Sequence, residues 1–516
     1  MISVYFFISH LFIVNKLQLV WFKKDLRIND HFPLTSASKN GPCLCLYIYE
    51  DELINADDFA NQHFQFLSQS LRELRKSLNN IGGDLIFRRG NAVEVLARLH
   101  GEHPFETIWA HEETGNLISY KRDIEVRNWA AKKSVQFIEN PQNGVVRKLQ
   151  SRDGWSKIWN QRMNEKLIPA PTSIQTPPNI NTGELRSSND FGIKHSKINK
   201  ISDGGEQNAH ECLDSFLKTR GQHYQKEMSS PVTAFDSCSR ISPYLTFGNI
   251  SIKSVFQKSK ERANQIKSLS NDEKIKNKGW LKSLSSFQSR LRWHCHFIQK
   301  LEDEPSIENF NINRAYDGLR EDSFNQNFFD AWSEGQTGYP MVDACMRALN
   351  QGGWINFRMR AMLVSFTSYH LWLHWKKPAT ELARLFVDYE PGIHYSQIQM
   401  QAGVTGINTV RIYSPIKQVT DQDPEGIFIK SYVPELNGLP DHHLAEPHKM
   451  TILEQSMYGC RIGKNYPNPI VDHVEAYKSA RDKIHSIKRM ASTRQESKKV
   501  FIKHGSRRTN RRPSKP

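Results

Sequence analysis

Short apolar runs alternate with helical patterns over the first 140 residues of the chain. The apolar runs cover residues 17–22, 43–50, 84–90, 107–112 and 135–140. Strands that alternate with helices form parallel sheets covered on both faces, so this order predicts a doubly wound α/β domain over residues 17–150. The first loop, after residue 22, lacks the Gly-x-Gly-x-x-Gly pattern, so classical dinucleotide binding is not indicated.

The rest of the chain has a different composition. Residues 169 to about 207 are rich in Pro, Asn, Ser and Gly without periodicity, and we interpret residues 151–210 as an interdomain connection. Almost continuous helical patterns follow, which predict a helical domain over residues 211–480. A chain of 516 residues with 38% hydrophobic residues is long enough to fill two or three such cores.

The segment from Thr337 to Arg360, TGYPMVDACMRALNQGGWINFRMR, combines a turn, an amphipathic helix and a glycine corner. A proline at the first helical position and apolar residues at helical spacing predict a helix that ends at Gly352-Gly353, with Trp354 opening the next one. From periodicity alone, an ordinary helical hairpin with an apolar core face is the favoured interpretation.

The formal charge of +16 is concentrated near the C-terminus. Residues 481–516 hold thirteen Lys or Arg and only two acidic residues. Such a segment, with few apolar residues, is predicted to be a disordered basic tail that adds phosphate affinity without sequence preference.

The seven cysteines lack paired spacing, which argues against a disulfide framework and favours a reducing, cytoplasmic location. No run is long enough to span a membrane. The first sixteen residues are apolar but lack a basic start and a small-residue cleavage site. They are therefore interpreted as an irregular extension, and not as a signal peptide.

Several longer motifs occur in a recognisable order. VWFKKDLRINDHFPL (residues 20–34), SCSRISPYLTFGNIS (237–251) and the segment that ends at Arg360 together resemble the DNA photolyase and cryptochrome family. The resemblance covers about nine-tenths of the chain. It implies an antenna domain followed by a helical FAD domain, with FAD as cofactor and a second antenna chromophore of the folate or flavin type. The strand end at residues 111–114 (His-Glu-Glu-Thr) suits such an antenna site, and an ordinary loop explains it equally well.

The resemblance also assigns residues to FAD. Hydroxyls and backbone amides at a helix start bind anions well, although a serine-rich helix cap explains the same string in isolation. The residues implied for the diphosphate are Tyr224, Cys238, Ser239, Arg240, Ile241 and Ser242. Arg360 is expected to pair with two carboxylates, Asp388 and Glu390, beside the flavin ring; a surface ion pair is the alternative.

Other implied roles concern catalysis. Gln288 and Arg292 match family positions that meet flavin and lesion, and Leu291 stands where many dimer-repairing members have a tryptophan. His394 is the nearest candidate for the position facing flavin N5. Of the three tryptophans that carry electrons in many members, only the middle one is matched, by Trp375; the other two positions hold Ile398 and Asp322. A substitute electron route through Trp372, Trp354, Tyr395 or Tyr413 is the hypothesis, and their role as core aromatics is the alternative.

The best interpretation is a monomeric flavoprotein that splits cyclobutane pyrimidine dimers in UV-damaged DNA under blue light. Phosphate contacts are expected from Lys226, Arg292, Arg358, Arg411 and Lys417. Repair of (6-4) photoproducts is disfavoured, because Phe357 and Ala361 occupy the positions of the histidine pair used there. A cryptochrome-like photoreceptor without repair activity remains the main alternative, and a nucleic-acid-binding flavoprotein without photochemistry is a weaker one.

Overall fold

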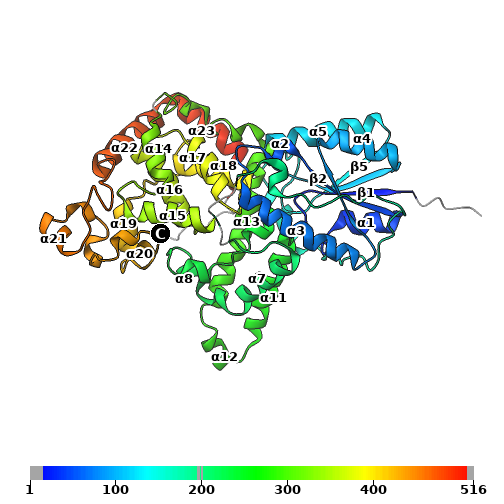
Figure 1. Ribbon diagram of the computed structural model, residues 1–516, viewed down its shortest axis with the longest axis horizontal. Coiled ribbons are helices and arrows are strands. Elements are labelled where there is room, and N and C mark those ends of the chain that lie inside the picture. The colour runs from blue at the N-terminus through cyan, green and yellow to red at the C-terminus, as the bar shows by residue number, and fades with distance from the viewer. Residues whose placement is uncertain (1–15, 195–197, 199–200, 323, 508–516) are drawn as a thin grey trace, which may run out of the picture.

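The computed structural model describes residues 16–194, 198, 201–322 and 324–507, and Figure 1 shows an α/β part beside a larger helical part. The five strands are β1 (Gln18–Phe22), β2 (Cys43–Tyr49), β3 (Leu85–Arg89), β4 (Thr107–His111) and β5 (Gln136–Asn140). They form one parallel sheet in the order β3-β2-β1-β4-β5. The predicted doubly wound sheet is confirmed.

The helices of the α/β domain follow the strands. They are α1 (Phe32–Asn40), α2 (Asp51–Ile54), α3 (Asn61–Asn79), α4 (Ala92–Glu102) and α5 (Leu117–Lys132). The connecting stretch then begins with α6 (Trp155–Asn164), which packs on α11. Residues 165–194 follow and are irregular apart from a short turn of helix at Ser188–Phe191.

The helical domain contains the remaining elements. Besides the helices named below, these include short 3-10 turns at Pro305–Glu308, Arg314–Tyr316, Pro434–Leu436, Asp441–His443 and Pro447–Lys449. The helices up to the glycine corner are α7 (Glu206–Lys218), η2 (Arg220–His223), α8 (Tyr224–Glu227), α9 (Ala234–Ser237), α10 (Ser242–Thr246), α11 (Ile252–Ser268), α12 (Asn271–Lys276), α13 (Trp280–Asp303), α14 (Gln326–Ser333) and α15 (Pro340–Gly352). After it come α16 (Phe357–Ser365), η5 (Phe366–His370), α17 (Lys376–Leu385), α18 (Pro391–Ala402), α19 (Pro415–Gln422), α20 (Ile427–Tyr432), α21 (Ile452–Met457), α22 (His473–Arg489) and α23 (Ala491–His504).

The glycine corner forms largely as the sequence indicates. Helix α15 begins at Pro340 and ends against Gly353, whose φ of 65° suits a residue without a side chain. Trp354 does not open the next helix, however. It lies buried in the loop before Phe357, where Arg240 and Arg360 pack over its ring.

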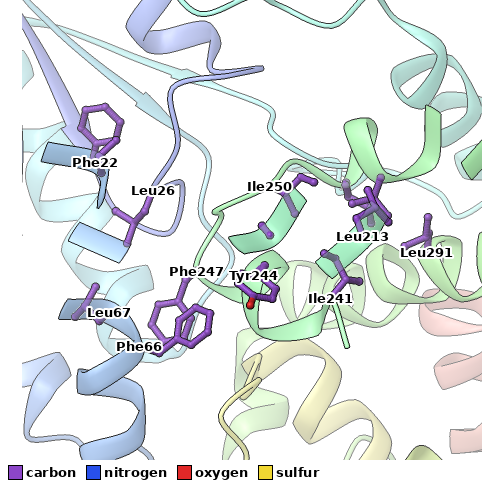
Figure 2. Packing of buried hydrophobic residues seen from close by; sticks show 14 of the residues in the cluster. Phe22, Leu26, Phe66, Leu67, Leu213, Ile241, Tyr244, Phe247, Ile250 and Leu291 are labelled. Atoms are coloured by element: carbon purple, nitrogen blue, oxygen red, sulfur yellow. The ribbon is translucent and has the colours of Figure 1, made fainter. Parts of the chain in front are cut away.

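The two domains share apolar contacts. In Figure 2, Phe66 of α3 meets Tyr244 and Phe247 of the α10 segment, with ring centroids 5.4 and 4.9 Å apart. The loop after β1 adds polar contacts, because the Arg27 guanidinium donates to the Gly248 carbonyl at 2.9 Å. Gly248 has a φ of 69°, and a Cβ there would overlap the backbone of Lys24, so the close approach requires glycine.

The prediction that the basic tail is disordered is wrong over its described part, residues 481–507. Helices α22 and α23 run through it, and Ile484 and Val500 are buried. Glu304 also accepts hydrogen bonds from Lys503 at 2.8 Å and from His504 at 2.7 Å. The few apolar residues have helical spacing, and their burial outweighs the repulsion among the basic side chains. The remainder of the tail, 508–516, and the predicted extension up to residue 15 lie outside the described residues.

None of the described helices combines the length and apolarity needed to cross a bilayer.

Candidate functional site

Three segments of the helical domain meet at Asp388. The Arg360 guanidinium donates two hydrogen bonds to this carboxylate, at 2.9 and 3.0 Å, and the Ser242 hydroxyl donates a third at 2.6 Å. Burial opposes ionisation of Asp388, but the Arg360 charge and these hydrogen bonds outweigh it and lower the pKa of the carboxyl. The pair is therefore ionised and fixes α10, α16 and the segment before α18 relative to one another.

The loop that precedes α10 is surrounded by arginines. Arg220 donates to the Cys238 carbonyl at 2.6 Å and to the Ser239 carbonyl at 3.2 Å, and Arg240 lies over the Trp354 ring at 4.1 Å. Arg220, Arg240, Arg290 and Arg360 are all close enough to the Cys238 thiol to act on it electrostatically.

Burial nevertheless dominates at this thiol and raises the pKa of Cys238 to about 12, so the cysteine is neutral. The adjacent Ser237 hydroxyl is buried without a hydrogen-bond partner among the described residues. Arg220 bonds the loop carbonyls and Arg360 bonds Asp388, so Arg240, Arg290 and the unpaired Ser237 hydroxyl are the groups here that suit a diphosphate.

Tyr224 lies at the start of α8 on the same side. Its hydroxyl pairs with the Arg290 side chain, and its ring packs edge-on against Phe216 at 5.6 Å. Ile241 is buried in the core beside these groups and contributes no polar atom to the site.

The predicted roles of Gln288 and Arg292 do not fit their positions. Arg292 points toward α6, where it donates to Asn160 at 3.3 Å and packs over Trp159 at 5.1 Å. Gln288 lies one turn earlier on the same face of α13. Arg290, two residues after Gln288, instead pairs with Tyr224 and lies near the Cys238 thiol, and His294 lines the cavity between the two domains.

The same offset corrects the interpretation of Leu291. This side chain is buried in the core, near Leu213 in Figure 2, and cannot contact a base. Trp293 is the exposed aromatic of this helix, 45% accessible, with Arg290 over its ring at 4.3 Å. The signal was present in the sequence, since Trp293 is the only tryptophan on this part of the helix after Trp280.

Glu390 does not join the Arg360 pair, contrary to the prediction. Its Oε2 atom lies 4.0 Å from the Lys24 ammonium of the α/β domain, and its Oε1 atom is buried without a partner among the described residues. Burial raises the pKa of this carboxyl. A small cavity between the two domains is lined by Glu390, Lys24, Glu113, Thr114, Gln142 and His294.

His394 is buried at the start of α18. Its Nε2 atom donates to the Ala379 carbonyl at 2.8 Å, which leaves Nδ1 as the acceptor. Burial lowers the pKa of His394 to about 4, so the ring is neutral near pH 7.

Trp375 is fully buried and donates from Nε1 to Asn311 at 2.7 Å. The ring of Tyr395, which can be oxidised, packs against Trp375 with centroids 6.3 Å apart, and the Tyr395 hydroxyl lies 3.4 Å from that of Tyr389. Tyr389 in turn donates to the Asp58 carboxylate at 2.6 Å. Ile398 belongs to the same core cluster, and Asp322 is exposed.

Trp372 has a different environment. The Arg320 guanidinium and the Lys483 ammonium lie 4.5 and 4.4 Å from its ring centre. Positive charge on this ring would meet two cations, so Trp372 is poorly suited to carry electrons.

The predicted phosphate contacts, apart from Arg292, belong to segments that are tied together. Asn356 donates to the carbonyls of Met228 and Ser229, which joins the start of α16 to the end of α8. The Ser365 hydroxyl donates to the Arg411 carbonyl, at 3.4 Å, and Ser230 donates to the Gln422 carbonyl at 2.8 Å. The basic residues carried by these tied segments are Lys226, Arg358, Arg411 and Lys417.

A second polar cluster lies at the end of β1 and β4. The Asp25 Oδ2 atom accepts from His31 Nε2 at 3.0 Å and from His111 Nδ1 at 2.8 Å. Since His31 Nδ1 accepts the Leu34 amide, its Nε2 must carry the proton, and a metal ion cannot take that place. The cluster is structural, and it uses the first residue of the predicted antenna segment at 111–114.

Comparison with known proteins identifies the family. Residues 18–153 match the DNA photolyase model, and residues 287–486 match the model of the FAD binding domain of DNA photolyase. The chain belongs to the DNA photolyase and cryptochrome family, and FAD is its cofactor.

Similar proteins include both photolyases and cryptochromes. A deoxyribodipyrimidine photo-lyase of Alkalihalophilus pseudofirmus is 28% identical, over 90% of this chain and 97% of its own. A cryptochrome DASH of Gloeobacter violaceus is 27% identical, over 89% of this chain and 93% of its own. A class III photolyase structure from Agrobacterium tumefaciens matches with a TM-score of 0.80 and 25% identity, over 92% of this chain and 98% of that chain.

Proposed function

We propose that the protein splits cyclobutane pyrimidine dimers in DNA under blue light. One observation carries the proposal. The helix that bears Arg360 is hydrogen-bonded to the neighbouring segments, and together these segments carry the cationic residues Lys226, Arg358, Arg411 and Lys417. Bound FAD supplies the electron that light makes available. The dimer gains one electron, its two ring bonds break, and the electron returns, so the reaction has no net oxidation.

The protein's own residues bind and orient. Ser239 and the guanidiniums of Arg240 and Arg290 hold the diphosphate, while Ser242, Arg360 and Asp388 fix the polar edge of the pocket. We assign contact with a flipped dimer to Trp293 and Arg290, because an exposed indole stacks on any base without reading sequence. Lys226, Arg358, Arg411 and Lys417 grip the flanking phosphates.

Repair is tested with purified, reduced protein and oligonucleotides that carry one defined lesion. We expect blue light to restore the thymines of a cyclobutane dimer, with no change in darkness and none for a (6-4) photoproduct. Chromatography of the oligonucleotide measures both. Repair of the (6-4) photoproduct alone would show that this lesion, and not the cyclobutane dimer, is the substrate. Repair of neither lesion would favour the photoreceptor function suggested by the cryptochrome relatives.

Trp375→Phe is expected to slow light-driven flavin reduction at least tenfold, because phenylalanine is far harder to oxidise than tryptophan. The decay of the oxidised flavin absorbance under blue light with an external thiol measures the rate. Trp372→Phe is the matched control, since its ring lies between two cations and is expected to leave the rate unchanged. A normal rate in Trp375→Phe would remove this residue from the route.

Three further assignments belong to the proposal. The interdomain cavity beside Glu113 and Thr114 is the candidate antenna site for a folate or flavin chromophore, although Glu113 is already bound to Arg122 at 2.7 Å. A Sulfolobus tokodaii photolyase with the same fold contains two FAD molecules. We also propose that the protein acts as a monomer in the cytoplasm, where DNA is accessible.

A further inference from the structure

A basic lobe projects from the helical domain between α11 and α13. It comprises residues 267–282, and its helix α12 lies at the lower tip of the molecule in Figure 1, below α7 and α8. The lobe lies outside the two stretches that match the family models. Its function therefore has to be argued from its own residues.

The lobe is attached to the segment that carries the candidate site. Gln222, just before Tyr224, donates to the carbonyls of Lys276 and Lys278 at 2.9 and 3.1 Å. Ser283, at the base of the lobe, donates to the Gln222 carbonyl at 2.8 Å and accepts the Gln225 amide at 3.2 Å. The lobe thus has a fixed position next to α8 and its exposed Lys226.

The charges of the lobe are unbalanced and unpaired. Its two acidic residues are Asp272 and Glu273, and Glu273 is used in the cap of α12, where it accepts from Ser270. Within the described part of the chain, none of the lobe's lysines forms an ion pair or a side-chain hydrogen bond. These exposed lysines are Lys267, Lys274, Lys276, Lys278 and Lys282.

One solvent-facing side of α13 leads from this lobe to the exposed Trp293. Lys282 stands near the start of α13, and Trp293 stands eleven residues later, about 16 Å along the helix. The residues between them on the solvent side are small, at Ser286 and Ser289, with Arg290 alongside. Small side chains let a backbone of phosphates approach the helix closely.

We propose that the lobe binds the sugar-phosphate backbone of duplex DNA beyond the damaged nucleotides. The inference rests on the proposed function for its substrate, but it concerns a surface that holds undamaged DNA equally well. Five free lysines without anionic partners complement a polyanion, and each neutralised phosphate releases counterions. The lobe therefore lengthens the bound duplex without reading its sequence.

The test compares two triple variants with the full-length holoprotein in darkness. One is Lys274→Gln, Lys276→Gln and Lys278→Gln. Its control, Lys39→Gln, Lys132→Gln and Lys133→Gln, removes the same charge from exposed positions on α1 and at the C-terminal end of α5 in the other domain. Fluorescence anisotropy measures the binding of an undamaged 30-base-pair duplex at several salt concentrations, and circular dichroism checks folding.

We expect the lobe variant to bind about tenfold more weakly near 0.1 M salt and to show a salt slope smaller by about 2 to 3. The control should retain the slope of the unaltered protein. Equal behaviour of the two variants, or no binding of the duplex by the unaltered protein, overturns the inference. A loss seen with anionic vesicles but not with DNA would reassign the lobe to membranes.

Light-dependent repair, measured on the same preparations, separates this inference from the proposed function. If the unaltered protein repairs no lesion but the lobe variant still loses duplex affinity, the proposed repair fails and the lobe assignment stands. If repair occurs and duplex affinity is unchanged in the lobe variant, the lobe assignment alone fails.

Discussion

Asp388→Asn is expected to lower the free energy of unfolding by about 3 kcal/mol and to weaken FAD binding at least tenfold. The substitution keeps the shape of the side chain but leaves the Arg360 guanidinium, mostly buried, without its counter-charge. It also weakens the bond from Ser242, which holds the start of α10 beside the arginine-rich loop. Urea unfolding gives the first quantity, and flavin fluorescence titration of the apoprotein gives the second.

Glu390→Gln is the matched control. Glu390 is only two residues from Asp388, but its carboxylate lies 4.0 Å from the Lys24 ammonium and has no bidentate partner among the described residues. The expected loss is about 1 kcal/mol or less. If the two variants lose the same stability, the Arg360 to Asp388 pair does not hold the pocket together.

Acid is expected to destabilise the protein through its buried histidines, most clearly through His111. Burial beside His31 lowers the pKa of His111 to about 3, and Asp25 only partly opposes this effect. In the unfolded chain the ring titrates near its ordinary pKa of about 6.5. Below that pH the unfolded state binds a proton that the folded state does not, so stability falls as the pH decreases from about 6.5 toward 3.

At pH 5 this one histidine is expected to remove about 2 kcal/mol relative to pH 7. His111→Asn should therefore lose about that much less stability over the same interval, because it keeps a donor for Asp25 but does not titrate. His442→Asn, at an exposed position, should behave like the unaltered protein. Comparing variants cancels the contributions of other groups, such as Glu50, whose pKa burial raises to about 7. Equal acid sensitivity of all three proteins would contradict the assignment.

The architecture could be predicted from the sequence because its signals are local. Each strand is a short apolar run of β-forming residues between turn residues, and α15 has a proline at its start and a glycine after its end. Both patterns depend only on neighbours in the chain. The family was predicted from the order of several such local motifs, and the two family models confirm it.

The site was predicted less completely, since its contacts join distant segments. Arg360 and Asp388 pair as the resemblance implied, but nothing in the sequence spacing indicates that Ser242 joins them or that Glu390 turns toward Lys24 of the other domain. On α13 the prediction chose Gln288 and Arg292, and Arg290 lies two residues from each. Two residues correspond to about half a turn of a helix, so the prediction selected the opposite face. Helical periodicity alone does not say which face meets a cofactor.

The prediction for the basic C-terminal segment was wrong for another reason. Its composition suggested disorder, yet a few apolar residues suffice when a helix packs on an existing surface, as α22 does against η5. Composition measures the average of a segment, whereas packing depends on one face of it.

The contacts between Phe66 and the α10 segment have a thermodynamic consequence. Phe247 belongs to the helical domain by sequence, but it packs in the same apolar cluster as Phe22 and Leu26 of the α/β domain. The Arg27 bond to Gly248 and the glycine approach to Lys24 lie at the same boundary. Neither domain can therefore lose its core without exposing part of the other's, and the α10 segment draws its rigidity from both.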